Sequence, residues 1–204
     1  MPADPEHAYA SRGGLKLAHG LRALGVSPAG LRCADFGCST GGFTDCLLQH
    51  GAARVQSIDT GYGVLAWRLR SDPRVVVRER TSALHAQPPE GGVDLVVMDM
   101  GWTPQRLCVP AALRWLGPEG RILTLVKPHY ELGPEERHLL RRGVLAPEEA
   151  RRVAARVLDQ MPGLGAAVLG SVESPITGSR GARAGNLEVL ALLRPARREP
   201  SSTA

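Results

Sequence analysis

Apolar residues along the chain follow two different spacings. Short apolar runs, several of them rich in valine, predict β-strands at residues 31–35, 55–59, 75–77, 93–99, 122–126, 167–172 and 187–193. Segments with apolar residues three and four positions apart predict helices at residues 14–24, 43–50, 64–70, 105–116, 135–142 and 147–161. This alternation predicts an α/β domain in which a mostly parallel, seven-stranded sheet carries helices on both faces.

The pattern divides the chain into one domain and two short ends. Residues 11–194 form the predicted domain, and the full length of 204 residues is within what one hydrophobic core can organise. Residues 1–10 are a short polar segment without the apolar core of a signal peptide. Residues 195–204 show no pattern of apolar positions and are expected to be a disordered tail.

Neither a membrane span nor a metal motif is visible in the sequence. No apolar run approaches the roughly 18 residues needed to cross a bilayer, so no membrane contact is expected. The four cysteines lack CxxC spacing, and we expect them to be reduced thiols in a cytoplasmic protein without a metal site. The net charge of +5 is compatible with a nucleic-acid partner but does not require one.

The basic residues are unusual in kind. Of 25 basic residues, 23 are arginine and only Lys16 and Lys127 are lysine. A coding bias toward arginine explains why lysine is rare, but it does not explain where the two lysines remain. Arginine keeps its proton at working pH, whereas lysine can release one. We therefore expect lysine-specific chemistry at these two positions.

Charged residues follow several predicted strands. Asp59 and Asp99 end the second and fourth strands, and Lys127 follows the fifth. The carboxyl ends of parallel strands meet at one edge, and open α/β sheets bind ligands there, where the strand order switches. These side chains are therefore expected to face a common site.

A glycine-rich segment follows the first predicted strand and is the candidate cofactor site. It starts at Asp35, and the further residues expected to contact a cofactor are Gly37, Ser39, Thr40, Gly41, Gly42 and Phe43. Glycines let the backbone approach a ligand closely. The spacing is neither GxGxxG nor that of a P-loop, which disfavours dinucleotides and triphosphates. Asp35 suits a ligand with a positive amino group, and Asp59 can bind both hydroxyls of a ribose.

This arrangement resembles the S-adenosylmethionine site of Rossmann-like methyltransferases. A nucleotide-binding fold with another ligand is the alternative. The resemblance implies S-adenosylmethionine as the cofactor, with Asp99 beside it. Arg80 and Thr81 follow the third strand, where such folds contact adenine.

Seven motifs make the resemblance more specific. In order along the chain they read SRGGLKL, STGGFTDCLL, DTGYGVL.W, LR.DPRVVV.ERT, LVKP, SPITG and GNLE. These stretches resemble the TlyA (hemolysin A) family of FtsJ-type ribosomal RNA 2′-O-ribose methyltransferases, in that family's order. They span residues 11–193, which is nearly the whole predicted domain.

The resemblance implies a catalytic tetrad of Lys16, Asp99, Lys127 and Glu188. A ribose hydroxyl is a poor nucleophile until its proton is removed, and the expected base is Lys127. Lysine is ordinarily protonated, so this role depends on burial and on neighbouring charges. Asp99 is expected to orient Lys127, while Lys16 and Glu188 position the substrate and balance charge.

RNA, ribosomal RNA in particular, is the expected partner. Arginines can contact phosphates, and aromatic rings can stack on bases. The candidate substrate contacts are Arg12, Trp102, His129, Arg180 and Arg183. Further arginines expected near the same edge are Arg68, Arg70 and Arg74, whereas the spacing of Trp67 predicts a core position.

Two departures from the family pattern keep other functions open. Only about ten residues precede SRGG, so the S4-type RNA-binding domain that the family usually carries there is expected to be absent. After Asp99 the family commonly has a Ser-Phe pair, and this sequence has Met100-Gly101-Trp102. The alternatives are an O-methyltransferase acting on a nucleoside or other small hydroxyl-bearing metabolite, and a non-catalytic RNA- or cofactor-binding protein.

Overall fold

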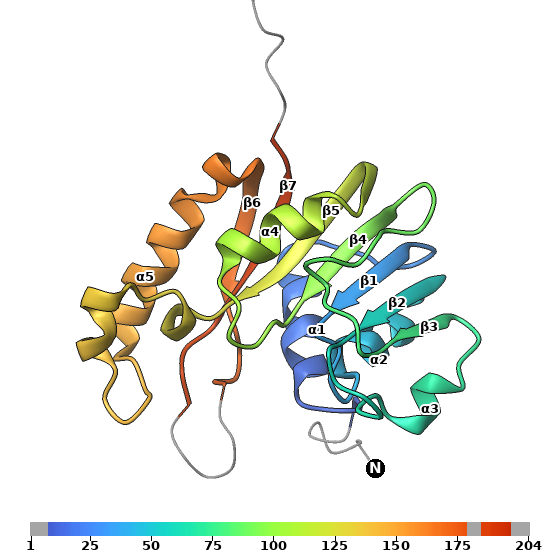
Figure 1. Ribbon diagram of the computed structural model, residues 1–204, viewed down its shortest axis with the longest axis horizontal. Coiled ribbons are helices and arrows are strands. Elements are labelled where there is room, and N and C mark those ends of the chain that lie inside the picture. The colour runs from blue at the N-terminus through green and yellow to red at the C-terminus, as the bar shows by residue number, and fades with distance from the viewer. Residues whose placement is uncertain (1–7, 179–184, 197–204) are drawn as a thin grey trace, which may run out of the picture.

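The computed structural model describes residues 8–178 and 185–196, which form a seven-stranded sheet and its covering helices (Figure 1). The strands are β1 Arg32–Phe36, β2 Arg54–Ile58, β3 Val75–Arg78, β4 Val93–Met98, β5 Leu116–Val126, β6 Ala166–Glu173 and β7 Val189–Pro195. The α-helices are α1 Gly13–Ala23, α2 Gly42–Gln49, α3 Trp67–Arg70, α4 Gln105–Leu113 and α5 Pro147–Asp159. Shorter 3₁₀ helices are η2 Pro128–Tyr130, η3 Pro134–Leu139 and η4 Met161–Leu164.

The strand order confirms the predicted sheet. Across the sheet it reads β3-β2-β1-β4-β5-β7-β6. The first five strands in the sequence are parallel, and β7 is antiparallel to both of its neighbours. The chain builds outward from β1 to β3 and then returns to the other side of β1 with β4, so the strand order switches between β1 and β4. Ligands bind such sheets at the carboxyl ends of the strands that flank the switch.

Apolar side chains cover both faces of the sheet. On one face Phe36 packs against Trp115, with ring centroids 5.2 Å apart, in the core beneath α4 and α5. On the other face Leu17 of α1 and Leu47 of α2 form the second core. Successive residues of a strand point to opposite faces, so every central strand contributes to both cores. Figure 1 shows α5 at the β6 end of the sheet and α3 at the β3 end.

Three predicted elements are shorter than their sequence pattern indicated. The helix predicted at residues 64–70 is the single turn α3, which starts at Trp67. The helix predicted at residues 135–142 is the 3₁₀ helix η3, followed by an isolated bridge between Arg141 and Val144. The helix predicted at residues 105–116 ends at Leu113. The regular helical hydrogen bonding therefore covers only part of each apolar stripe.

Two strands also differ from prediction at their ends. β5 starts at Leu116, ahead of Gly117-Pro118, because Leu116 pairs with Val93 of β4 before a break in register. β7 starts at Val189 and reaches Pro195, one residue into the predicted tail. Residues 197–204 of that tail lie outside the described residues.

The described end of the N-terminal segment packs against α2. Ala10 N donates to Asp45 Oδ2 at 2.7 Å, and Gln49 Nε2 donates to Ala8 O at 2.9 Å. The Tyr9 ring covers Gly14, whose missing side chain leaves room for it. None of the described helices is long and apolar enough to cross a membrane.

A close contact between the first turns of α1 and α2 gives the fold a testable constraint. A Cβ on Gly42 would lie 2.9 Å from Gly14 N and 3.2 Å from Ser11 O, and these backbone atoms cannot move independently. We expect Gly42→Ala to lower the free energy of unfolding by about 1–3 kcal/mol through overpacking, measured by urea denaturation. The control is Gly163→Ala, because nothing lies within 4 Å of the added Cβ. Equal stability of the two variants would refute the constraint.

Candidate active site

The carboxyl edge of the sheet gathers lysines and carboxylates from four segments. Asp99 directly follows β4, and Lys127 directly follows the adjacent parallel strand β5. Glu188 directly precedes β7, which is antiparallel to β5 and therefore begins at the same edge. Lys16 lies near the start of α1. The structure thus brings the predicted tetrad to one edge.

Two ion pairs connect these four residues. Lys127 Nζ lies 2.5 Å from Asp99 Oδ1, and Lys16 Nζ donates a hydrogen bond to Glu188 Oε2 within a second ion pair. The exposed fractions of the side chains are 14% for Lys127, 24% for Asp99, 11% for Lys16 and 3% for Glu188. A buried ammonium is costly unless a carboxylate beside it compensates for lost water. The pairing therefore explains how both lysines are held in a largely closed site.

The two pairs share one electrostatic environment. Burial raises the pKa of Glu188, and the negative charge of Asp99 adds to this increase. The positive charges of Lys16 and Lys127 oppose it. Burial also lowers the pKa of His129 to about 4, and the charges of Lys127 and Lys16 add to this effect. The His129 ring is therefore neutral at neutral pH. Its Nδ1 is buried and has no hydrogen-bond partner among the described residues.

Glu188 is positioned by a short bridge outside β7. Glu188 falls within the strand predicted at residues 187–193, but β7 starts one residue later, and an isolated bridge between Gly178 and Asn186 precedes Glu188. Gly178 N donates to Asn186 O at 2.9 Å. A Cβ on Gly178 would lie 2.2 Å from Glu188 Oε1, so only glycine fits there. The SPITG and GNLE motifs thus meet at Glu188.

The glycine-rich segment forms a tight turn between β1 and α2. Gly37 has a φ of +81°, and a Cβ there would lie 2.9 Å from Asp99 O. Gly41 has a φ of +101° and packs so closely under Leu69 of α3 that a Cβ would lie 2.3 Å from its Cδ1. Ser39 and Thr40 are exposed at the tip of the turn. The turn therefore adjoins the tetrad on one side and α3 on the other.

Asp59 joins the turn to two other predicted cofactor segments. Its Oδ2 accepts from Ser39 N at 2.9 Å, and its Oδ1 accepts from Gly61 N at 2.7 Å. Its carbonyl accepts from Thr81 N at 2.9 Å. Arg80 has a φ of +52° and its guanidinium lies 4.2 Å from the centroid of the Tyr62 ring. The structure thus assembles the residues expected around a nucleoside.

The other predicted residues of this segment lie beneath the turn. Asp35 is fully buried, where its Oδ2 accepts from Thr44 Oγ1 at 2.7 Å. Burial raises the pKa of Asp35 to about 7, and its Oδ1 has no partner among the described residues. Phe43 is in the core below α1, and Gly42 packs against α1. Side chains in these positions support the turn and do not reach its surface.

Aromatic residues lie beside the Lys127–Asp99 pair. Trp102 is 82% exposed and has a φ of +60°. Its ring centroid lies 4.9 Å from that of Tyr130, whose own ring lies 6.0 Å from Lys127 Nζ. His129 contacts Tyr130 as well, at 4.0 Å between ring centroids. The core position predicted for Trp67 is wrong, because α3 is a single surface turn and Trp67 is 79% exposed.

Several of the predicted phosphate-binding arginines have partners within the protein. Arg68 pairs with Asp45, Arg70 with Glu79 and Arg74 with Asp72, so these three are structural ion pairs. Arg12 is exposed at the start of α1. Arg180 and Arg183 lie outside the described residues.

Glu79 is a site residue that the sequence did not single out. Its Oε2 accepts from Gly63 N at 2.9 Å, and its Oε1 accepts from Val64 N at 3.1 Å and from Leu65 N at 3.3 Å. Arg70 Nη1 donates to the same Oε1 at 2.6 Å. These bonds hold the loop after Asp59 and explain why α3 starts late. The bonding partners are mostly backbone amides, so no pattern of residue types indicates them.

The described residues contain no group of three His, Cys, Asp or Glu side chains that could hold a metal ion.

The fold and the position of the site define the class. A parallel sheet with one antiparallel strand, and a glycine-rich turn after β1 at the switch point, form a Rossmann-like methyltransferase fold. An S-adenosylmethionine-dependent methyltransferase from Mesorhizobium loti shares the fold with a TM-score of 0.60 at 18% identity, over 86% of this chain and 96% of that one. Residues 9–184 match the FtsJ-like methyltransferase family, and the chain belongs to this family.

Individual relatives are considerably more similar. A Mycobacterium tuberculosis protein named 16S/23S rRNA (cytidine-2′-O)-methyltransferase TlyA is 48% identical over 132 residues, 64% of this chain and 49% of that protein. A Bacillus subtilis protein named "Putative rRNA methyltransferase YqxC" is 39% identical over 89% of this chain and 64% of its own length. A structure titled "Putative hemolysin from Streptococcus thermophilus" superposes with a TM-score of 0.84 at 35% identity, over 93% of this chain and 68% of that one. The chain thus spans about half to two thirds of the length of the curated relatives it matches.

The bonds to Glu79 predict a local effect of its charge. Folding lowers the Glu79 pKa from 4.5 to about 2, mainly through the bond from Gly63 N, so these bonds stabilise the fold above about pH 4.5 and are lost as the pH falls toward 2. We expect Glu79→Gln to increase hydrogen exchange at the amides of Gly63, Val64 and Leu65 about tenfold at neutral pH. The exposed Glu119→Gln is the control. Unchanged exchange in Glu79→Gln would contradict the assignment.

Proposed function

We propose that this chain is the catalytic domain of an S-adenosylmethionine-dependent methyltransferase that modifies the ribose 2′-hydroxyl of RNA, ribosomal RNA in particular. The observation that carries the proposal is the two lysine–carboxylate contacts beside the glycine-rich turn, the partly exposed Lys127–Asp99 pair and the buried Lys16–Glu188 pair. The printed names of the M. tuberculosis and B. subtilis relatives support the RNA substrate.

The turn suits a nucleoside with a charged amino-acid tail. S-adenosylmethionine, when bound, supplies a methyl group on a sulfonium as the electrophile. The close approach of Gly37 to Asp99 leaves backbone without side chains next to the tetrad, where a ligand can lie close to the chain. Asp59 is half-buried at the end of β2, where a carboxylate can bind ribose hydroxyls. Arg80 and Thr81 are adjacent and suit the adenine end.

Lys127 acts as the general base in the proposed reaction. Once its ammonium has given up a proton, its Nζ accepts the proton of the 2′-hydroxyl as that oxygen attacks the methyl carbon and the bond from this carbon to sulfur breaks. Asp99 holds the Lys127 side chain by the 2.5 Å contact and stabilises the ammonium that forms. The Lys16 ammonium, fixed by Glu188, lies in the same electrostatic environment and suits the developing oxyanion.

Trp102 and Tyr130 provide an exposed aromatic surface beside Lys127 for the target nucleotide. Stacking a base there would bring its ribose toward the lysine, because the sugar is joined directly to the stacked base. His129 would lie beside this aromatic surface as a neutral ring, and Arg12, Arg180 and Arg183 would contact phosphates.

The first test replaces the proposed base. Lys127→Arg retains the positive charge but removes the group that can release a proton, so we expect the rate of methyl transfer to fall about 10²–10⁴-fold. The assay incubates the purified chain with tritiated methyl donor and ribosomal subunits or total RNA, and then maps ribose methylation.

The matched control is Arg54→Lys, which exchanges the same two cations at an exposed position on β2 and should leave the rate unchanged. A wild-type rate of methyl transfer by Lys127→Arg would show that Lys127 is not the general base. Turnover of a nucleoside without any methylation of RNA would favour a small hydroxyl-bearing substrate instead.

A second test addresses the aromatic surface. We expect Trp102→Ala to raise the KM for RNA about five- to hundredfold, because stacking on an aromatic ring contributes about 1–3 kcal/mol per base. Trp102→Phe should retain much of the affinity, and Trp67→Ala, on the distant α3, should have little effect. An unchanged KM in Trp102→Ala would exclude stacking on this ring.

A further inference from the structure

We propose that Glu131 is a positioning residue that joins the segment carrying Lys127 to the segment carrying Asp99, and so keeps the lysine–carboxylate pair aligned. The inference rests on the proposed function, because it assigns Glu131 an effect on the rate through these two residues. Glu131 itself belongs to neither ion pair of the tetrad.

The two catalytic groups lie on chain segments that diverge after the sheet. β4 ends before Asp99, and the chain continues through the Trp102 turn into α4. β5 ends before Lys127, and the chain continues through η2 to Glu131. Backbone pairing between the two strands stops at the sheet edge, with Met98 opposite Thr124. Beyond this point, side-chain contacts must hold the two segments together.

Glu131 supplies such a contact at the start of α4. Its Oε1 accepts a hydrogen bond of 2.8 Å from the backbone N–H of Gln105, the first residue of α4. The residue before it, Pro104, makes no side-chain cap. A carboxylate at a helix N-terminus satisfies an amide that the helix leaves unbonded and interacts favourably with the helix dipole. The cap of α4 is therefore provided by the other catalytic segment.

Gln105 extends the connection back into the sheet. Its buried side-chain Oε1 accepts from Thr124 Oγ1 of β5 at 2.9 Å. Thr124 lies three residues before Lys127, so the contacts form a closed path from β5 through Gln105 to Glu131 and back along the chain to Lys127. A closed path of this kind restricts both segments in a way that one ion pair cannot.

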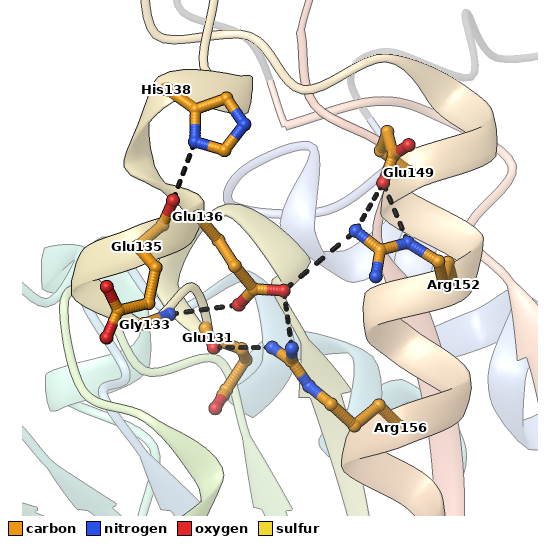
Figure 2. Close-up of polar contacts among 8 residues, drawn as sticks. All are labelled: Glu131, Gly133, Glu135, Glu136, His138, Glu149, Arg152 and Arg156. Carbon is orange, nitrogen blue, oxygen red and sulfur yellow. Dashed lines mark hydrogen bonds and ion pairs between the residues drawn. The ribbon is translucent and has the colours of Figure 1, made fainter.

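The backbone of Glu131 is anchored from the outside by α5. Arg156 Nη2 donates to Glu131 O at 3.1 Å, and Arg156 Nη1 lies 2.5 Å from Glu136 Oε1. Glu136 Oε2 accepts from Gly133 N at 3.1 Å. Figure 2 shows Arg156 reaching from α5 to both acceptors, with Arg152 on the other side of Glu136 paired to Glu149. The main chain of Glu131 is thus fixed by Arg156, so its side chain can position the first residue of α4, Gln105.

The aromatic surface spans the same gap. Trp102 belongs to the Asp99 segment and Tyr130 to the Lys127 segment, and their ring centroids lie 4.9 Å apart. Glu131 directly follows Tyr130. Its bond to Gln105 N holds the chain three residues after Trp102. Loss of this bond should therefore disturb both the ion pair and the stacked rings.

Two conservative substitutions distinguish the effect of the side-chain length of Glu131 from the effect of its charge. Glu131→Asp keeps the charge but is one methylene shorter, so it should lose contact with Gln105 N. Glu131→Gln keeps the length and an acceptor oxygen. We expect Glu131→Asp to lower kcat about 10- to 100-fold with the KM for methyl donor changed less than about threefold, because small misplacements of reacting groups reduce rates by such factors. Glu131→Gln should retain most of the wild-type kcat.

The control is Glu149→Ala, which removes a carboxylate of the same network that touches only the Arg152 side chain. It should leave kcat unchanged. A wild-type kcat in Glu131→Asp, or equal losses in the aspartate and glutamine variants, would overturn the positioning role. A purely structural cap would lower stability without this difference in kcat.

A readout independent of activity distinguishes this inference from the proposed function. Hydrogen exchange at Gln105 N, and acrylamide quenching of Trp102 in a Trp67→Phe background, should both increase in Glu131→Asp. If the wild-type chain transfers no methyl group to RNA, the proposed function is wrong and these two measurements still test the link. If neither changes, Glu131 does not join the segments, whatever the activity.

Discussion

The need to compensate two buried ammonium groups shapes the site. A lysine that loses most of its contact with water requires a carboxylate beside it, and here each lysine has one. Those carboxylates must come from fixed backbone, which the edge of a parallel sheet provides at Asp99 and, through the antiparallel β7, at Glu188. The topology and the chemistry are therefore linked: the site can form only where β4, β5 and β7 lie side by side.

The rest of the molecule holds the segments that leave this edge. Asp59 and Glu79 bind the backbone amides of the loops around the glycine-rich turn, and Glu131 caps α4 from the segment after Lys127. In each case a carboxylate accepts from backbone N–H groups of another segment. Such bonds fix loop geometry without depending on residue type, which gives loops the rigidity that a reacting site requires.

The sequence was sufficient for the fold class, a mostly parallel seven-stranded sheet with helices on both faces. Lys16 and Lys127 stand out because lysine is so rare in this chain, and the family resemblance grouped them with Asp99 and Glu188 as the proposed tetrad. The same reasoning was wrong for Trp67 and did not show that the side chains of Asp35 and Phe43 are buried, since it could not tell which face of a short segment is covered. It also missed Glu79 and Glu131, whose partners are amides that every residue possesses.

What the sequence determined by itself is the set of local patterns: apolar periodicity, glycines at the turn, and ordered motifs ending in charged residues. These patterns depend only on residues close together in the chain, and the sequence gives those residues directly. Only the tertiary structure decided which lysine pairs with which carboxylate, because Lys16 and Glu188 are 172 positions apart and meet only when α1 packs beside β7. It likewise decided that Arg68, Arg70 and Arg74 are paired inside the protein. Pairing is a property of distance in space, and distance in space depends on the whole fold.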